Sequence, residues 1–208
     1  MIPADTAFVA IDVQNDFCPG GALAVAQGDQ VVPLINRMMP QFPVKVLTQD
    51  WHPADHFSFA ANSPGAEAFS VIDAPYGPQV MWPIHCVQGS AGAKFHPQLQ
   101  TDCVDLIIRK GYRSHIDSYS AFFENDHTTP TGLEGYLRER GVKSLVMAGL
   151  ATDFCVRFSA VDAAKLGFDV TVLEDGCRAI DMDGSLAAAM AEMADHGVAV
   201  ISSADYRV

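Results

Sequence analysis

Four side chains with useful chemistry stand at or just after short apolar runs of the chain. Asp12 closes the first run, Asp50 and Lys110 follow two later runs, and Cys155 begins a helical stretch after another. Unpaired backbone N–H groups at a helix start stabilise a thiolate, and a lysine ammonium adds to that effect. A carboxylate such as Asp12 could take the thiol proton and later deliver it to a leaving group. These residue types predict nucleophilic catalysis by Cys155.

Each of these residues also has a structural interpretation. A cysteine early in a helix is often a small buried hydrophobe. Asp12 could form a turn, and Lys110 could be a solvated charge after a strand. We expect Thr152 to be the N-cap of the helix, which places Cys155 at the third helical position. Without Lys110, the negative charge of Asp12 would repel a thiolate on Cys155. The catalytic interpretation therefore requires that all three side chains lie close together.

A second group of residues has the chemistry of metal ligands. Asp50 and His52 are two residues apart, so in an extended chain both point to the same side. His85, in the stretch MWPIHCVQGS, could supply a third ligand, and His56 is either a fourth ligand or a group that supports the others. One carboxylate and two imidazoles suit Zn, Fe or Mn and leave coordination positions for a substrate atom. The alternative is that these are hydrogen-bonding turn residues.

Short apolar runs rich in β-branched residues alternate with helical patterns along the chain. The predicted strands are Ala7–Val13, Val44–Thr48, Val104–Arg109, Ser144–Ala148, Asp169–Leu173 and Ala199–Ser202. The predicted helices are about Gln30–Met39, Thr131–Arg140, Thr152–Leu166 and Ser185–His196. Three of these helices are followed by glycines that we expect as C-caps, namely Gly141, Gly167 and Gly197. Most strands are nearly continuous apolar runs, which is typical of strands covered on both faces.

This alternation predicts an α/β fold. Repeated strand–helix units with right-handed crossovers give a three-layer α/β/α sandwich around a central, mostly parallel six-stranded sheet. In such sheets ligands bind outside the carboxyl ends of the strands, where the polar residues above are expected to meet. We expect one domain over residues 1–208, with a long loop at about 51–103. That loop shows no clear helix and is far longer than the usual structureless connection, so we expect it to be functional and to carry the metal site.

Composition limits the classes of partner. The formal net charge of -12 argues against nucleic acid or an anionic membrane surface, which basic residues would have to bind. The apolar runs are too short to span a membrane, and no signal-like segment opens the chain, so we expect a cytoplasmic protein with a small-molecule ligand. The 5 cysteines are widely spaced, which predicts reduced thiols rather than a disulfide framework. Oligomeric state is not readable from the sequence, and a homo-oligomer stays open.

Five segments, in this order, resemble the nicotinamidases (also pyrazinamidases) of the isochorismatase-like cysteine hydrolases. They are AIDVQNDFCPGGAL, TQDWHPADHFSF, WPIHCVQGS, RKGYRSHIDSYSAFFEND and GLATDFCVRFSA, and they run through nearly the whole chain. The resemblance implies a catalytic triad of Asp12, Lys110 and Cys155. It also implies that Asp50, His52 and His85 bind one divalent metal ion per chain. Zinc is the expected metal, and iron and manganese are the alternatives.

The same resemblance implies further site residues. A cis peptide before Ala151 would aim the amides of Ala151 and Cys155 at an oxyanion. A flat substrate ring would lie between Phe17, Trp82 and Tyr119. His56 matches a position that coordinates metal in only some members of the family, so its role stays open.

The activity implied by the resemblance is hydrolysis of nicotinamide to nicotinate and ammonia, a step of NAD salvage. Three alternatives stay open. A related cysteine amidohydrolase acting on carbamoyl or ureido substrates would keep Asp12, Lys110 and Cys155, but the metal ligands and aromatic residues argue against it. Isochorismate hydrolysis resembles this pattern without a nucleophilic cysteine. A non-catalytic nicotinamide-binding protein would have no need of the three catalytic residues.

Overall fold

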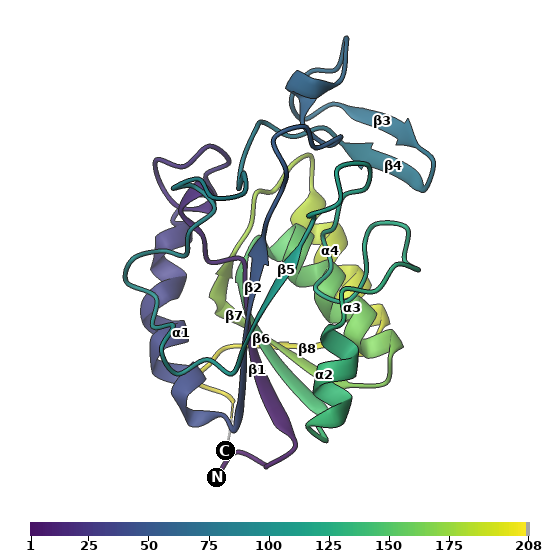
Figure 1. Ribbon diagram of the computed structural model, residues 1–208. Coiled ribbons are helices and arrows are strands. Elements are labelled where there is room, and N and C mark those ends of the chain that lie inside the picture. Colours follow the sequence, from purple (N-terminus) through teal and green to yellow (C-terminus); the bar gives the residue numbers. More distant parts are fainter. Residues whose placement is uncertain (207–208) are drawn as a thin grey trace.

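The computed structural model describes residues 1–206 and shows three layers, with helices on both faces of a central sheet (Figure 1). The sheet contains six strands, in spatial order β5-β2-β1-β6-β7-β8. Their bounds are β1 Thr6–Ile11, β2 Val44–Asp50, β5 Leu106–Lys110, β6 Ser144–Leu150, β7 Asp169–Arg178 and β8 Ala199–Ile201. Every pairing between neighbours is parallel, so the predicted fold class is confirmed and the sheet is wholly rather than mostly parallel.

Within the described part of the chain, four α-helices cover the sheet. They are α1 Val32–Met38, α2 Leu133–Glu139, α3 Arg157–Lys165 and α4 Ser185–Asp195. Helix α1 lies on one face, while α2, α3 and α4 lie on the other (Figure 1). The glycines after α2, α3 and α4 have φ of 70°, 84° and 74°, as expected for C-caps. The helices thus lie and end close to the positions that their sequence patterns predict.

The strand order places a ligand-binding position between β1 and β6. From β1, the chain builds β2 and β5 to one side and then returns to build β6, β7 and β8 on the other. Crossovers leave in opposite directions from these two neighbouring strands, so a crevice opens outside their carboxyl ends. The residues that follow β1 and β6 include Asp12 and Cys155.

Several predicted boundaries are wrong by a few residues. β1 ends at Ile11 rather than Val13, and β7 continues to Arg178 rather than ending at Leu173. The predicted helix from Thr152 begins with a π-helical turn, Thr152–Val156, before α3. The residues of β7 beyond Leu173 include exposed Glu174 and Asp175, which interrupt the apolar run although the backbone pairing continues.

The long segment after β2 is not a plain loop, because it contains an antiparallel hairpin. Strands β3 Val71–Ala74 and β4 Gly77–Val80 pair with each other and stand beyond the carboxyl ends of the large sheet (Figure 1). Isolated β-bridges hold the segment in place, including one between His52 and Val87 and one between Phe59 and Trp82. The hairpin was not predicted from the sequence, since its strands are four residues long and carry no clear alternation.

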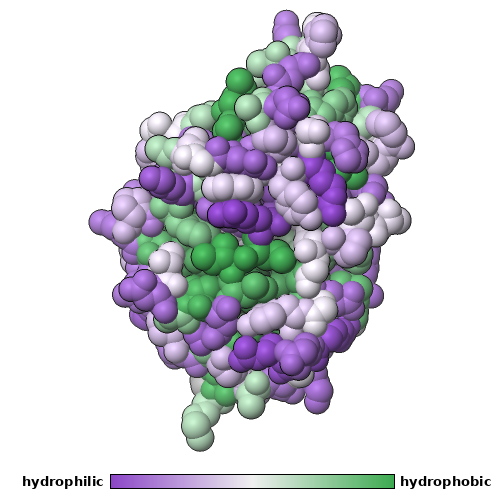
Figure 2. Space-filling view, in the orientation of Figure 1, coloured by the Kyte–Doolittle hydropathy of each residue, from purple (hydrophilic) through white to green (hydrophobic). Residues whose placement is uncertain are grey.

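The surface of the molecule shows apolar side chains beside the edge of the sheet. Figure 2 shows an apolar area over β2 and β5, where Ile107 is exposed and its neighbours Leu106 and Ile108 are partly buried. Strand β5 is an edge strand, so its outer side has no neighbour within the described chain. Within residues 1–206, no helix is long and apolar enough to cross a membrane.

Gly149 allows β6 to approach β1 closely. Its φ is 137°, and a Cβ atom at this position would lie 2.1 Å from the carbonyl oxygen of Ile11. Real Cβ atoms do not approach backbone so closely, and a side chain would also be strained at this φ. The glycine therefore fixes the spacing of the two strands beside the crevice.

We predict that Gly149→Ala destabilises the protein by at least about 2 kcal/mol, because backbone must move to admit the methyl group. Gly135→Ala is the matched control: it lies in α2, and its Cβ would meet nothing within 4 Å. That change should be neutral or stabilise by up to about 1 kcal/mol. Urea unfolding of both variants measures the difference, and equal stability would contradict this account of Gly149.

Candidate active site

The structure brings Asp12, Lys110 and Cys155 together at the carboxyl ends of four neighbouring strands. Asp12 follows β1, Lys110 is the last residue of β5, and Cys155 lies in the π-helical turn after β6. Asp50, the last residue of β2, lies beside them. The predicted convergence at this edge of the sheet is confirmed.

Lys110 is the centre of this group. Its ammonium is fully buried and lies 2.9 Å from Asp12 Oδ2 and 2.8 Å from Asp50 Oδ1. It also donates to the carbonyl oxygen of Ser118 at 2.8 Å and to Cys155 Sγ at 3.4 Å. Burial disfavours the charged ammonium, but Asp12 and Asp50 more than offset this and hold the pKa of Lys110 well above its usual value. The lysine is therefore a permanent cation beside the thiol.

The Asp12 carboxylate is fixed on one side and faces the thiol on the other. Its Oδ1 accepts a hydrogen bond from the Thr48 hydroxyl at 2.5 Å, and its backbone N–H donates to Thr48 Oγ1 at 3.0 Å. Its Oδ2 lies 2.9 Å from Nζ of Lys110, and the carboxyl group also interacts with the thiol of Cys155. Burial raises the pKa of Asp12, although Lys110 opposes that shift. A carboxylate with a raised pKa, whose Oδ2 is ion-paired but accepts no hydrogen bond, is suited to accept a proton.

Cys155 differs in two respects from the sequence prediction. The N-cap of its helix is Ala151 rather than Thr152, so Cys155 is the fourth helical residue rather than the third. The expected lowering of its pKa is also wrong. Burial raises the pKa of the thiol well above its usual value, and the opposing effect of Lys110 does not offset it. The thiol is thus protonated at rest, and its proton must leave as it attacks.

The backbone before Cys155 has the geometry that the resemblance implies. The peptide bond between Leu150 and Ala151 is cis. The carbonyl of Ala151 accepts hydrogen bonds from Phe154 and Val156, which forms the wide π-helical turn. π-helical turns within helices are frequent at functional sites.

Asp50, His52 and His85 form a compact cluster of metal-ligating groups. One ligand atom of each lies within 4.8 Å of the others, and all three side chains are buried. Nδ1 of His52 donates to the carbonyl oxygen of Gly111 at 2.8 Å, and Nδ1 of His85 donates to that of Pro83 at 2.8 Å. Nε2 is therefore the nitrogen that each imidazole turns toward Asp50, at 2.9 and 3.5 Å from Oδ2.

This donor set fits a divalent metal ion. Two imidazole lone pairs and a carboxylate oxygen repel one another unless a cation or a proton lies between them. Gly111 permits the arrangement, since a Cβ atom there would lie 2.5 Å from the ring of His52. Any other residue at this position would displace the imidazole.

His56 lies next to this cluster but is engaged differently. Its Nε2 donates to the carbonyl oxygen of Ile116 at 3.1 Å, and its Nδ1 accepts from the Ser58 hydroxyl at 2.8 Å. Burial and the neighbouring His52 lower the pKa of His56 to about 4. Both nitrogens of this neutral imidazole are occupied, although it also lies near His52 and Asp117 in a second group of potential ligands.

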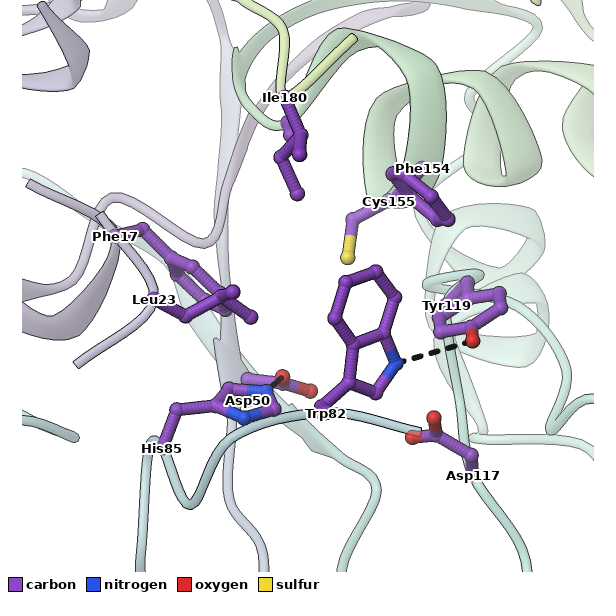
Figure 3. A pocket seen from close by; sticks show the side chains of 11 residues that line it. Phe17, Leu23, Asp50, Trp82, His85, Asp117, Tyr119, Phe154, Cys155 and Ile180 are labelled. Carbon is purple, nitrogen blue, oxygen red and sulfur yellow. Dashed lines mark hydrogen bonds and ion pairs between the residues drawn. The ribbon is translucent and has the colours of Figure 1, made fainter. Parts of the chain in front are cut away.

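A pocket opens between the catalytic residues and the metal-ligating cluster (Figure 3). Phe17 and Leu23 line one side, and Trp82 and Tyr119 line the other (Figure 3). Cys155 Sγ points into the space between them. Three predicted aromatic residues thus lie around the pocket, and its walls suit a flat ring.

Sequence reasoning missed four of the residues that line the pocket, namely Leu23, Asp117, Phe154 and Ile180. Phe154 precedes Cys155 in the chain and could have been found from that position. Ile180 is held at the rim because its backbone N–H and that of Asp181 donate to the Asp153 carboxylate, at 3.0 and 2.8 Å. Asp153 and Ile180 lie far apart in the sequence, so no local sequence pattern predicts this contact.

Fold and site together define an α/β protein with the machinery of a cysteine hydrolase. Residues 6–205 match the Isochorismatase domain, and the chain belongs to this family. It is 54% identical over 197 residues to a nicotinamidase of Acinetobacter baylyi, covering 95% of this chain and 92% of the relative. It is 41% identical to a nicotinamidase of Escherichia coli, covering 96% of each.

Solved structures show the same fold. A nicotinamidase and pyrazinamidase of Acinetobacter baumanii superposes with a TM-score of 0.98 at 53% identity, covering 100% of both chains. A protein of L. infantum in complex with nicotinate gives 0.85 at 40% identity, covering 98% of this chain and 96% of the other. A pyrazinamidase of Pyrococcus horikoshii in complex with zinc gives 0.76 at 34% identity, covering 95% and 99%.

We predict that Lys110→Met destabilises the protein by about 3 kcal/mol or more, because it leaves Asp12 and Asp50 buried without their counter-ion. Lys143→Met is the matched control, since Lys143 is exposed and its ion pair with Asp5 spans 3.6 Å. That variant should change stability by less than about 1 kcal/mol. Chemical denaturation at neutral pH gives both values, and a Lys110 variant as stable as the control would refute the buried-charge account.

Proposed function

We propose that this protein is a nicotinamidase that hydrolyses nicotinamide to nicotinate and ammonia and also accepts pyrazinamide. The observation that carries the proposal is the contact of Cys155, Lys110 and Asp12 at the wall of an aromatic pocket. The named relatives support it, because the chain aligns with them over nearly its full length. The reaction supplies nicotinate for NAD salvage.

Acylation begins at the protonated thiol. Asp12 takes the proton as Sγ of Cys155 attacks the carboxamide carbon, so a buried thiolate never has to exist alone. Lys110 stabilises the negative charge that passes between sulfur and carboxylate, since it contacts both. The amides of Ala151 and Cys155 donate to the oxyanion of the tetrahedral intermediate, a contribution of about 3 kcal/mol per donor in comparable sites.

The same carboxyl group completes the cycle. Asp12 delivers its proton to the departing nitrogen, and the C–N bond breaks to release ammonia and leave a thioester on Cys155. A water molecule then gives a proton to Asp12 and attacks the thioester carbon. Collapse of this second intermediate expels the sulfur, which recovers the proton from Asp12, and the product leaves as nicotinic acid, which ionises to nicotinate by giving its proton to ammonia or water. One group serves in turn as base and acid because its raised pKa lies nearer to neutrality.

Asp50, His52 and His85 would hold one divalent ion, with zinc as the proposed metal and iron or manganese as alternatives that the same donors accept. A bound ion would offer a coordination position to the ring nitrogen of the substrate and so orient the ring. We leave His56 out of the ligand set, since both of its nitrogens are hydrogen-bonded. Phe17, Trp82 and Tyr119 then hold the faces and edge of the ring.

Ammonia release from the purified protein tests the activity. We expect turnover of nicotinamide and pyrazinamide and little or none of an N-carbamoyl compound offered in parallel. Cys155→Ala should lower the rate by at least about a thousandfold with the fold intact, since it removes the nucleophile. Failure on both ring amides would overturn the proposed function, while substantial turnover by the alanine variant would overturn the covalent mechanism alone.

Elemental analysis tests the ligand set. His52→Ala should lose most of the bound metal, because it removes one of three donors from the cluster. His56→Gln is the control: it should keep the metal, since its nitrogens serve Ser58 and Ile116 instead. A full metal content in His52→Ala, or its loss in His56→Gln, would contradict the assignment.

A further inference from the structure

Gln79 is the one fully buried residue of the β3–β4 hairpin, whose other residues are exposed or partly buried. Gln79 has no exposed surface, whereas Val71 on the paired strand is 61% exposed. Burial of a carboxamide costs free energy unless its polar groups are hydrogen-bonded, and an aliphatic side chain would cover the hairpin without that cost. The buried carboxamide of Gln79 is therefore expected to form specific hydrogen bonds.

Both ends of the Gln79 carboxamide are satisfied. Its Nε2 lies 2.6 Å from the carbonyl oxygen of Val80, 2.8 Å from Asp117 Oδ2 and 3.0 Å from the hydroxyl of Tyr119, so its two protons are shared among three acceptors. Its Oε1 accepts from the hydroxyl of Tyr76 at 2.9 Å and from Nδ2 of Asn125 at 3.2 Å. Acceptors surround the nitrogen and donors surround the oxygen, so the amide has one orientation.

The hydrogen bonds continue from Gln79 into the pocket wall. Nε1 of Trp82 donates to the same Tyr119 hydroxyl at 3.1 Å (Figure 3). The rings of Trp82 and Tyr119 meet edge to face, with centroids 6.1 Å apart. Both line the pocket beside Cys155. A continuous chain of contacts thus joins the hairpin to the surface that would face a substrate ring.

The orientation of the Trp82 indole depends on this chain. Its other ring contacts, with Phe69, His85 and Phe154, are edge-to-face ring contacts that tolerate small rotations. The N–H group is the one polar atom of the indole, and its hydrogen bond to Tyr119 selects a single rotation. The Tyr119 hydroxyl is in turn held by Gln79, which is anchored on the buried carboxylate of Asp117. Hydrogen bonds to a charged partner are the stronger kind.

We propose that Gln79 is a positioning residue that holds the Tyr119–Trp82 wall in the geometry that a flat aromatic amide requires. It thereby sets the affinity of the pocket for the ring without touching the reacting atoms. This inference rests on the proposed function, since it assigns Gln79 a part in binding that substrate.

Steady-state kinetics of Gln79→Met tests the proposal, since methionine fills a similar volume without the polar groups. We expect KM for nicotinamide to rise by about fivefold or more, and kcat to change by less than about twofold. Gln79→Glu should show the same rise, because it keeps an acceptor for Tyr76 but loses the donor to Tyr119. Asp73→Met is the matched control on the same hairpin; its side chain is exposed and KM should not change.

Two further measurements separate positioning from a general structural role. In a Tyr119→Phe background, Gln79→Met should have little additional effect on KM, because the hydroxyl through which it acts is gone. Alkylation of Cys155 by iodoacetamide, followed by mass spectrometry of its peptide, should proceed at the wild-type rate in Gln79→Met. Protection of that thiol by nicotinamide should require about fivefold or more higher concentration.

The proposal is overturned if Gln79→Met lowers kcat with KM unchanged, if Asp73→Met gives the same rise, or if the effect persists in full in the Tyr119→Phe background. It is also overturned if the two Gln79 variants do not fold, since the residue would then be needed for the fold itself. Failure of the proposed function would look different, because the wild-type protein would then release no ammonia from nicotinamide.

Discussion

The buried ammonium of Lys110 is the constraint on which the rest of the structure depends. An uncompensated charge in the interior costs several kcal/mol, and here the compensation comes from Asp12, Asp50 and the carbonyl of Ser118. Asp12, Asp50 and Lys110 stand at the ends of β1, β2 and β5, and Cys155 follows β6. The two counter-ions reach the ammonium only when β5, β2 and β1 lie side by side in their observed register, and β6 beside β1 adds Cys155 to the group. The strand pairing that forms this part of the sheet therefore also brings the catalytic residues together.

Asp50 connects the catalytic residues with the metal-ligating cluster. Its Oδ1 faces Lys110, while its Oδ2 faces the Nε2 atoms of His52 and His85. When neither imidazole carries an extra proton, two carboxylates and one ammonium leave a net negative charge in a buried site, which favours the binding of a cation. The same electrostatics explain why Asp12 and Asp50, equally buried, differ: the pKa of Asp12 is raised, whereas that of Asp50 is lowered by His52 and Lys110 against the effect of burial. One carboxyl group can move a proton and the other stays ionised.

The sequence predicted the parts of the fold and site that backbone regularity determines. In a parallel sheet, residues at strand ends meet at one edge, so Asp12, Asp50, Lys110 and Cys155 could be placed together from the apolar runs alone. What it could not predict depends on contacts between irregular segments. The burial of Gln79 and the approach of Ile180 to the pocket follow from side-chain hydrogen bonds across distant parts of the chain. The prediction that Thr152 is the N-cap was wrong for a related reason. The backbone path after β6 overrides the local preference of threonine for that position.

This difference in predictability reflects a division of roles within the molecule. Backbone pairing in the large sheet fixes Asp12, Lys110 and Cys155, so a substitution that moves them also disturbs strand order and the buried charge. The pocket walls come instead from segments outside that sheet, such as Phe17 before α1 and Trp82 after β4. Their positions depend on a few hydrogen bonds and ring contacts, which can change without loss of the sheet. The positions of the catalytic residues therefore depend strongly on the sheet, whereas the positions of the pocket walls depend on it only weakly. A fold built in this way can keep one reaction while the surface that binds the substrate ring varies.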